Sequence, residues 1–405
     1  MARLRLGYTK SKTGCLRCKQ RRVKCDENKP CRACVRHGVE CSLVSGHSPT
    51  SSTVSVSTQQ TAREEPSSSS DPFPYFAKFV SGRPDSQIAD WVSDMELLHQ
   101  WSTSTFQTIV EPDATPNIRR LWQVEVPQMS FKHTFLLHQI LAISAYHLAY
   151  LRPESCQQYC LRASQHQNVA IKTMRDELST VTPENCHALL VASGFLFTSV
   201  LAASQFESAS AVPAPSPSVD DLIDVFVLIK GIRGLLDTSE TVLAAGPLRE
   251  LFAVYNVPDK GNLMLDRIIK QLDMFLHCLR DIKIDSEDLD QKTTGIMETT
   301  TRCLMQMIRD AIAHCTDPEH RIVTSFPIMM PDEYVPLLRQ KNQLALVLLS
   351  YYCVILHACE LRFWFMKGWS GAVMMDISRI AKAPWIEHSA WSMGWITAAK
   401  DGVPD

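Results

Sequence analysis

The short motifs that most enzyme classes need are missing from this 405-residue chain. It contains no HExxH, no phosphate-binding GxxxxGK[ST] and no GxSxG, and the run GIRG at 231–234 is too short for a dinucleotide-binding loop. Histidine and cysteine adjoin at 186–187, 277–278 and 314–315. Adjacent helical residues point about 100° apart, so these pairs do not by themselves form a shared site. We therefore predict that the protein is not an enzyme.

A secretory signal is also missing, although the chain holds 14 cysteines. Residues 1–6 contain no apolar core of the kind that a signal peptide needs. A disulfide framework requires an oxidising compartment, and nothing in the sequence indicates one. We therefore expect the cysteines to act as thiols or as metal ligands.

Charge is nearly absent from two long stretches, 185–206 and 343–359. A membrane-spanning helix needs about 20 predominantly apolar residues, so both stretches are long enough to raise that question. Polar side chains interrupt each of them, including Asn185, His187, Ser350 and His357. Helices buried on all sides of a large bundle have the same composition. We therefore predict buried helices and no membrane span.

Six of the cysteines fall within the first 41 residues, and their spacing repeats: C-x2-C-x6-C, five residues, then C-x2-C-x6-C. These cysteines are Cys15, Cys18, Cys25, Cys31, Cys34 and Cys41. A closed tetrahedral zinc site takes four ligands, so three thiolates in each half cannot close two separate sites. If two thiolates bridge the metals, six cysteines suffice for two Zn²⁺. The spacing therefore predicts one binuclear cluster over residues 15–41.

Basic residues lie between these cysteines. Residues 1–41 hold twelve Lys and Arg against three Asp and Glu, a net charge of +9, whereas the whole chain carries −2. A short helix after Cys15 would present Arg21 and Arg22 at its tip, where an arginine fork matches the acceptors of guanine. Arg17, Lys19 and Lys24 would then lie against phosphates, giving affinity and register without reading sequence. This pattern favours double-stranded DNA as the partner.

The segments CKQRRVKCD at 18–26 and NKPC at 28–31 resemble the fungal binuclear zinc cluster transcription factors. The resemblance implies that Cys15 and Cys31 bridge the two metals. Cys18 and Cys25 would complete the first site, and Cys34 and Cys41 the second. It further implies that Arg22 is the main base reader with Arg21 beside it, that the DNA site is a CG-rich triplet, and that the protein acts in the nucleus.

The composition divides the chain into four parts. Residues 1–14 form a basic arm, 15–41 the cluster, 42–85 a linker and 86–405 a large helical region. Fourteen of the 26 residues from 45 to 70 are Ser or Thr, which predicts disorder. No heptads follow the cluster directly, so either the cluster reads DNA as a monomer or the helical region forms a homodimer.

Apolar-rich stretches without β-alternation predict an all-α fold after residue 86. Thr182 before Pro183, and Ser218 before Asp220 and Asp221, have the chemistry of helix starts. We expect helices at 86–106, 131–151, 154–178, 183–204, 219–236, 262–283, 296–316, 331–366 and 374–397. The expected fold is thus a small zinc-stabilised cluster domain, a disordered linker and an all-α regulatory domain.

A second resemblance lies in the helical region, in DMELLHQW at 94–101, VPQM at 126–129, FLLH at 135–138 and AISAYHLA at 142–149. These segments resemble the regulatory domain of sterol uptake control type regulators, most clearly over residues 90–205. That resemblance implies binding of a sterol or another apolar ligand and control of sterol or secondary-metabolite genes.

Aromatic and methionine side chains beside Gly368 and Gly371 are the candidate ligand pocket. These side chains are Phe363, Trp364, Met366 and Trp369. Ordinary core packing of a helix end is the alternative interpretation.

Together these observations predict a zinc-dependent, sequence-specific transcription factor of RNA polymerase II genes, with a helical domain that regulates it and contacts coactivators. The alternative from another class is a zinc-folded interaction module that binds a protein or RNA, with the basic residues serving only as a general attraction for polyanions.

Overall fold

The computed structural model describes residues 13–20, 23–37, 39, 41–44, 85–110, 114–207, 216–252, 261–281 and 291–398. The chain divides into two compact units, Met1–Ser81 and Gly82–Asp405. The predicted basic arm and linker lie almost entirely outside the described residues.

The first unit contains two short helices, α1 (Leu16–Gln20) and α2 (Arg32–Arg36), each beginning directly after a cysteine. Its buried core consists of the six N-terminal cysteines, with Ala33 and Leu43 packed against them. Leu16 and Val35 on the helices themselves are exposed. So small a core contains too little apolar surface to fold by hydrophobic burial alone, so its sulfur atoms must supply the missing stability through metal binding.

The second unit is built from helices, and among its described residues there is no strand, as the sequence predicts. Its α-helices are α3 (Asp85–Gln100), α4 (Phe106–Thr108), α5 (Pro116–Arg120), α6 (Val126–Ser130), α7 (Thr134–Leu151), α8 (Cys156–Leu178), α9 (Cys186–Glu207), α10 (Val219–Lys230), α11 (Ile232–Ala245), α12 (Leu263–Asp281), α13 (Gln291–His314), α14 (Pro318–Met329), α15 (Tyr334–Arg339), α16 (Gln343–Glu360), α17 (Trp369–Ile380) and α18 (Trp385–Ala398).

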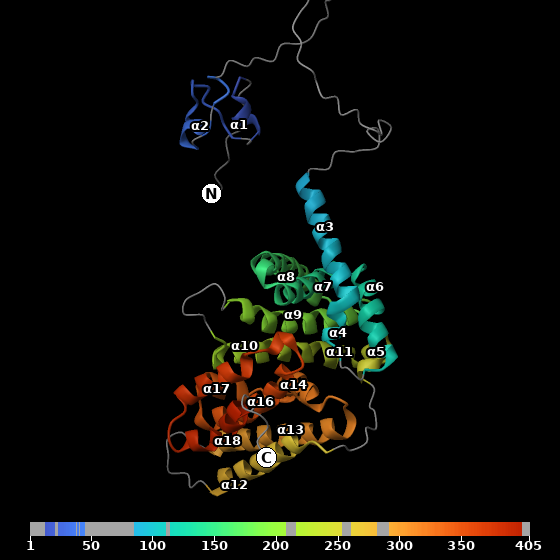
Figure 1. Ribbon diagram of the computed structural model, residues 1–405, viewed down its shortest axis with the longest axis vertical. Helices are drawn as coiled ribbons and strands as arrows, with labels where there is room; N and C mark the ends of the chain where they lie inside the picture. Colours follow the sequence, from blue (N-terminus) through green and yellow to red (C-terminus); the bar gives the residue numbers. More distant parts are fainter. Residues whose placement is uncertain are drawn as a thin grey trace, which may run out of the picture. The chain divides into compact units, whose positions relative to one another are not determined.

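Two hydrophobic clusters hold this unit together. One lies among α7, α9, α11 and the segment around Trp101, whose ring meets that of Phe195 edge-on with centroids 5.1 Å apart. The other surrounds α16 and draws on α10 and α12 to α18. Figure 1 shows α7, α8 and α9 toward one end of the unit and α12 to α18 toward the other, with α10 and α11 between them.

Among the residues that the structure describes, three helices are long and apolar enough to cross a membrane: Thr134–Leu151, Cys186–Phe206 and Gln343–Glu360. Within the fold, 72%, 72% and 83% of these segments are buried against other helices. Nearly every residue of α16 is buried. The uncharged stretches that the sequence assigns to buried helices therefore lie in the core of the helical unit.

Several helix boundaries differ from the sequence prediction. The expected helix 331–366 is two α-helices, α15 and α16, followed by a short 3-10 helix at Trp364–Met366. The first break occurs because Lys341 adopts a left-handed φ of 55° and the Asn342 side chain accepts the Ala345 N–H to begin α16. The expected helix 374–397 is likewise divided, and Pro384 lies in the break before α18. Pro384 has no N–H to donate to a continuing helix.

The helix expected from Pro183 is regular from Cys186. Hydrogen bonds nevertheless close the turn after Thr182, because the Asn185 side chain accepts the N–H of Thr182 at 2.8 Å and the Cys186 N–H donates to the Thr182 carbonyl at 3.0 Å. The prediction also missed α5, α6 and α14. The Asp317 side chain caps α14 and Pro318 occupies its first turn, so the start signal was present in the sequence.

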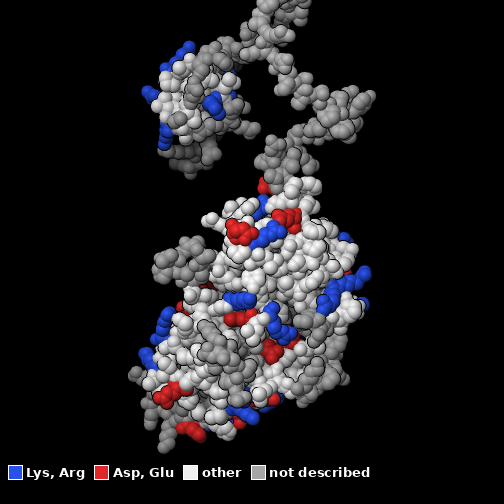
Figure 2. Space-filling model, viewed as in Figure 1, with Lys and Arg blue, Asp and Glu red and all other residues white. Residues whose placement is uncertain are grey.

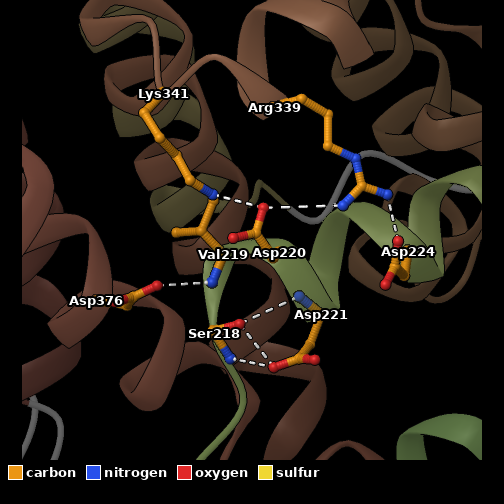
Figure 3. A network of polar contacts seen from close by, with 8 residues as sticks. All are labelled: Ser218, Val219, Asp220, Asp221, Asp224, Arg339, Lys341 and Asp376. Atoms are coloured by element: carbon orange, nitrogen blue, oxygen red, sulfur yellow. Dashed lines mark hydrogen bonds and ion pairs between the residues drawn. The ribbon is translucent and has the colours of Figure 1, made fainter.

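The predicted start of α10 is confirmed, and Figure 3 shows its surroundings. Ser218 and Asp221 form a reciprocal capping box. The Val219 N–H donates to Asp376 of α17 at 2.9 Å, and Lys341 donates to Asp220 at 2.6 Å. Arg339 pairs with Asp224 one turn further along. Polar contacts thus fix the first turns of α10 to the α15–α16 turn and to α17.

Candidate metal centre and DNA interface

The six cysteines form two groups of four that share two members. Cys15 and Cys31 belong to both groups, Cys18 and Cys25 complete one, and Cys34 and Cys41 complete the other. Within each group the sulfur atoms all lie within 4.8 Å of one another. This is the division that the resemblance to the zinc cluster family implies, with Cys15 and Cys31 as the bridging pair.

The distances between sulfur atoms suit tetrahedral zinc. The Sγ atoms of Cys15 and Cys31 lie 3.7 Å apart, as do those of Cys15 and Cys34, and those of Cys18 and Cys31 lie 3.6 Å apart. A Zn–S bond of about 2.3 Å gives a tetrahedral edge of about 3.8 Å. Each group therefore matches the coordination shell of one Zn²⁺.

Backbone N–H groups point at the sulfur atoms in an arrangement that repeats between the halves. The Cys15 N–H donates to Cys25 Sγ at 3.4 Å, and the Cys31 N–H donates to Cys41 Sγ at the same distance. The Cys18 N–H donates to Cys15 Sγ at 3.3 Å. Such bonds favour the charged form of a thiol, which is the form that binds metal.

Two side chains that the sequence analysis did not single out tie the halves together. The Leu16 N–H, at the start of α1, donates to Ser42 Oγ at 2.8 Å. The Arg32 N–H, at the start of α2, donates to Asp26 Oδ1 at 3.0 Å. Ser42 and Asp26 each directly follow the third cysteine of their half, so each half caps the helix of the other.

Without metal, the six thiols do not ionise alike. Burial acts to raise the pKa of Cys15, but hydrogen bonds from Cys18, Cys34 and Cys31 lower it to about 6. Burial, followed by contacts with neighbouring cysteines, raises the pKa of Cys18 and raises that of Cys34 to about 12. Six thiolates in one small core therefore need cations beside them. Two Zn²⁺ supply four positive charges, so the chemistry of the donor set fits a binuclear zinc cluster.

Exposed cations surround α1. Arg17, Lys19 and Lys24 are all exposed, as the predicted phosphate contacts require, whereas Arg21 and Arg22 lie outside the described residues. Arg32 and Arg36 of α2 are also exposed, and the sequence analysis did not include them. Figure 2 shows Lys and Arg around this unit and both signs of charge over the helical unit.

The four residues proposed to bind an apolar ligand are all buried: Phe363, Trp364, Met366 and Trp369. The indole N–H of Trp364 donates to Thr108 Oγ1 at 3.0 Å, and that of Trp369 donates to the Leu201 carbonyl at 3.1 Å. The Trp364 ring stacks on His147. Their apolar and polar surfaces are therefore used in packing within the helical unit.

A cavity of about 380 Å³ lies beside Trp369, which is the one member of this set that lines it. Its wall also includes Val200 and Ala203 of α9 and the carboxylates Asp221 and Asp224 of α10. This lining is more polar than the aromatic and methionine-rich wall that the sequence predicts.

Comparison with known proteins places the N-terminal unit in a family. Residues 13–51 match the fungal Zn(2)-Cys(6) binuclear cluster domain. A "Zn(2)-C6 fungal-type transcription factor afumD" of Aspergillus fumigatus is 36% identical over 152 residues, which cover 37% of this chain and 36% of that protein. The chain thus spans about a third of that relative's length.

Of two further relatives, one is similar over nearly the whole chain and the other is a sterol uptake control protein. A "Zn(2)-C6 fungal-type transcription factor" of Gibberella zeae is 22% identical over 96% of this chain and 86% of its own length. "Sterol uptake control protein 2" of Candida albicans is 27% identical over 29% of this chain and 16% of its own length. Residues 13–51 are therefore a fungal Zn(2)-Cys(6) binuclear cluster domain, whose six cysteines fit two Zn²⁺, and the chain is similar to fungal Zn(2)-C6 transcription factors and distantly similar to the sterol uptake control proteins.

Proposed function

We propose that this protein binds double-stranded DNA sequence-specifically through its zinc cluster and regulates RNA polymerase II genes in the nucleus. The observation that carries the proposal is the pair of four-cysteine groups sharing Cys15 and Cys31, with exposed Arg17 and Lys19 on the helix that follows Cys15. Zinc folds the unit and thereby fixes the direction in which α1 presents its cations.

The dimensions of α1 limit how it reads DNA. A helix of five residues is about 7.5 Å long, so it enters the major groove by its end and presents two or three side chains to base edges. Arg21 and Arg22 follow Gln20, the last residue of α1, and are the proposed base readers at a CG-rich triplet. Arg17, Lys19 and Lys24 are the proposed phosphate contacts, which set affinity and register.

We further propose that the helical unit regulates the cluster, and that the pathway is sterol or secondary-metabolite biosynthesis. The name and similarity of the Candida albicans relative support the sterol alternative. Burial of Phe363 and Met366 weighs against a preformed pocket at those two residues. Lipid extraction of the purified protein tests the idea, and it fails if no sterol is recovered and none shifts the melting temperature.

How the protein pairs on DNA, and whether the helical unit contacts coactivators, are parts of the same proposal. A monomer would select a single triplet, whereas a homodimer would select two triplets at a fixed spacing. The symmetry of the selected sequence therefore distinguishes the two arrangements.

The experiment is selection of bound sequences from a random DNA pool by the zinc-loaded, full-length protein. We expect enrichment of a CG-rich triplet. If zinc is bound at two ions per chain and no sequence is enriched, the cluster is instead an interaction module for a protein or RNA partner.

A further inference from the structure

A second group of thiols lies outside the zinc cluster, at the start of α8. The Sγ atoms of Cys156 and Cys160 are 3.8 Å apart, one helical turn from each other. Both residues are half-buried, so a small solute can reach this pair. By contrast, Cys186, Cys353 and Cys359 of the same unit are 0%, 0% and 1% exposed.

From this geometry we propose that Cys156 and Cys160 are a site of reversible oxidation, which hydrogen peroxide converts to an intrahelical disulfide. The inference goes beyond the proposed DNA-binding function and does not depend on it. The Cα atoms of residues i and i+4 in a helix are about 6.2 Å apart. This lies within the range of about 4.4–6.8 Å that disulfides span. The Cβ atoms of such a pair are about 5–6 Å apart on a regular helix, more than the roughly 3.5–4.5 Å of a disulfide, so the bond requires the first turn of α8 to distort.

The surroundings of each sulfur assign it a role. Cys156 is the first residue of α8, and its own N–H donates to the Pro153 carbonyl of the preceding 3-10 helix. Burial, and then the neighbouring Cys156, raises the pKa of Cys160 to about 12, so Cys160 keeps its proton. Cys160 is thus the resolving thiol, and Cys156 is the thiol that peroxide oxidises first.

The reaction balances with one peroxide. The Cys156 thiolate attacks a peroxide oxygen, so an S–O bond forms, the O–O bond breaks and hydroxide leaves to be protonated to water. Cys160 sulfur then attacks the Cys156 sulfenic acid, forming the S–S bond and releasing the oxygen as a second water with the Cys160 proton. Two thiols are oxidised and one peroxide is reduced.

Residues around the start of α8 also form polar contacts with α3. Arg152, between α7 and α8, donates to Glu96 of α3 at 2.9 Å, and the Tyr159 hydroxyl donates to the same carboxylate at 3.1 Å. Tyr159 lies between the two cysteines in the sequence. A change in the geometry of Cys156 and Cys160 would therefore act on the contact of Tyr159 with Glu96 of α3.

The chain offers a direct readout. Trypsin cuts after Lys132 and Arg162 but not before Pro153, and the peptide 133–162 contains Cys156 and Cys160 as its only cysteines. The experiment treats zinc-loaded, full-length protein with limiting hydrogen peroxide, alkylates the remaining thiols, and maps this peptide by mass. Zinc content is measured in parallel to show that the cluster stays intact.

We expect most of peptide 133–162 to become lighter by two hydrogens and lose both alkylation sites, with dithiothreitol restoring them. Cys156→Ser should leave Cys160 free to alkylate, whereas Cys303→Ser, a half-buried cysteine on α13, should leave the oxidation unchanged. The proposal is overturned if both thiols stay alkylatable, or if each is oxidised separately without an S–S bond. The wild-type map alone decides this, even if a variant fails to fold.

Discussion

At the scale of single residues, base reading and phosphate binding make different demands on the cations of the cluster. A base reader discriminates between sequences, at about 1–3 kcal/mol for a good bidentate pair. A phosphate contact adds affinity that is the same for every sequence. The proposed roles of Arg22 and Lys19 therefore differ in a measurable way.

Arg22→Ala should lower affinity for the selected site by about 5- to 150-fold and relax preference at one base pair, because the lost bonds go to base edges. Lys19→Ala should weaken all sequences alike and reduce the slope of log affinity against log salt by about one. Binding of the selected and scrambled duplexes across a salt series measures both. Uniform weakening by Arg22→Ala would exclude base reading by that residue.

Gly246 is a position where no side chain fits. A Cβ added there would lie 2.0 Å from Nε2 of His187, a buried ring at the start of α9. Gly246→Ala should therefore destabilise the helical unit by about 1–3 kcal/mol, because the histidine must move within a packed core. Thermal or urea unfolding followed by circular dichroism measures this.

Gly295→Ala is the matched control for that substitution. Gly295 is exposed within α13, and nothing lies within 4 Å of an added Cβ. Alanine there should leave stability unchanged or raise it by up to about 1 kcal/mol, because it is the better helix former. Equal effects of the two substitutions would show that the His187 contact is not the cause.

At the scale of helices, a buried carboxylate caps the start of α14. Asp317 caps α14 and is 1% exposed, and its carboxylate forms an ion pair with Arg362 at 2.9 Å. Burial raises the pKa of Asp317 while Arg362 opposes that rise. The ion pair therefore connects the start of α14 to the turn after α16.

Arg362→Ala should destabilise the protein by about 1–3 kcal/mol near neutral pH, because it leaves a buried carboxylate without its counter-ion. An acid whose pKa is raised by folding binds its proton more tightly in the folded state, so stability falls as pH rises through that pKa. The penalty of the substitution should consequently shrink toward acidic pH, where Asp317 is protonated.

Denaturant unfolding at several pH values measures that trend, and Asp317→Asn supplies the control. Asparagine keeps a side-chain oxygen for the His320 N–H and removes the charge. Adding Asp317→Asn to Arg362→Ala should recover part of the lost stability. A penalty that is independent of pH would contradict the role given to the buried charge.

Sequence reasoning recovered the long helices because their hydrophobic pattern is local. It missed the break at Lys341 because a left-handed residue other than glycine leaves little signal in composition. In the cluster, spacing alone predicted the metal and its ligands. The cross-caps from Asp26 and Ser42 were missed because each side chain caps the helix of the other half, with partners 6 and 26 residues away in the sequence, a contact that only the folded chain reveals.

At the scale of the whole molecule, stability comes from two unlike sources. Sulfur and zinc hold the first unit, whereas two hydrophobic clusters hold the second. Removal of zinc should therefore abolish DNA binding and leave the thermal transition of the helical unit unchanged. Chelation followed by circular dichroism melting measures this, and loss of the helical transition on chelation would show that the units do not fold separately.

Zinc affinity should also decrease as the pH is lowered, because thiols must release protons to bind metal. The raised pKa of Cys34 places the metal in competition with protons. Acidification below neutral should release zinc and DNA together, whereas DNA binding that survives complete zinc release would contradict this linkage.

The most direct test of the central claim is a titration of zinc into metal-free, full-length protein in the presence of its selected DNA duplex. The account predicts that specific binding appears as zinc is added and saturates at two ions per chain, one for each cysteine group. Specific binding without zinc, or saturation at one ion, would contradict a binuclear cluster that reads DNA.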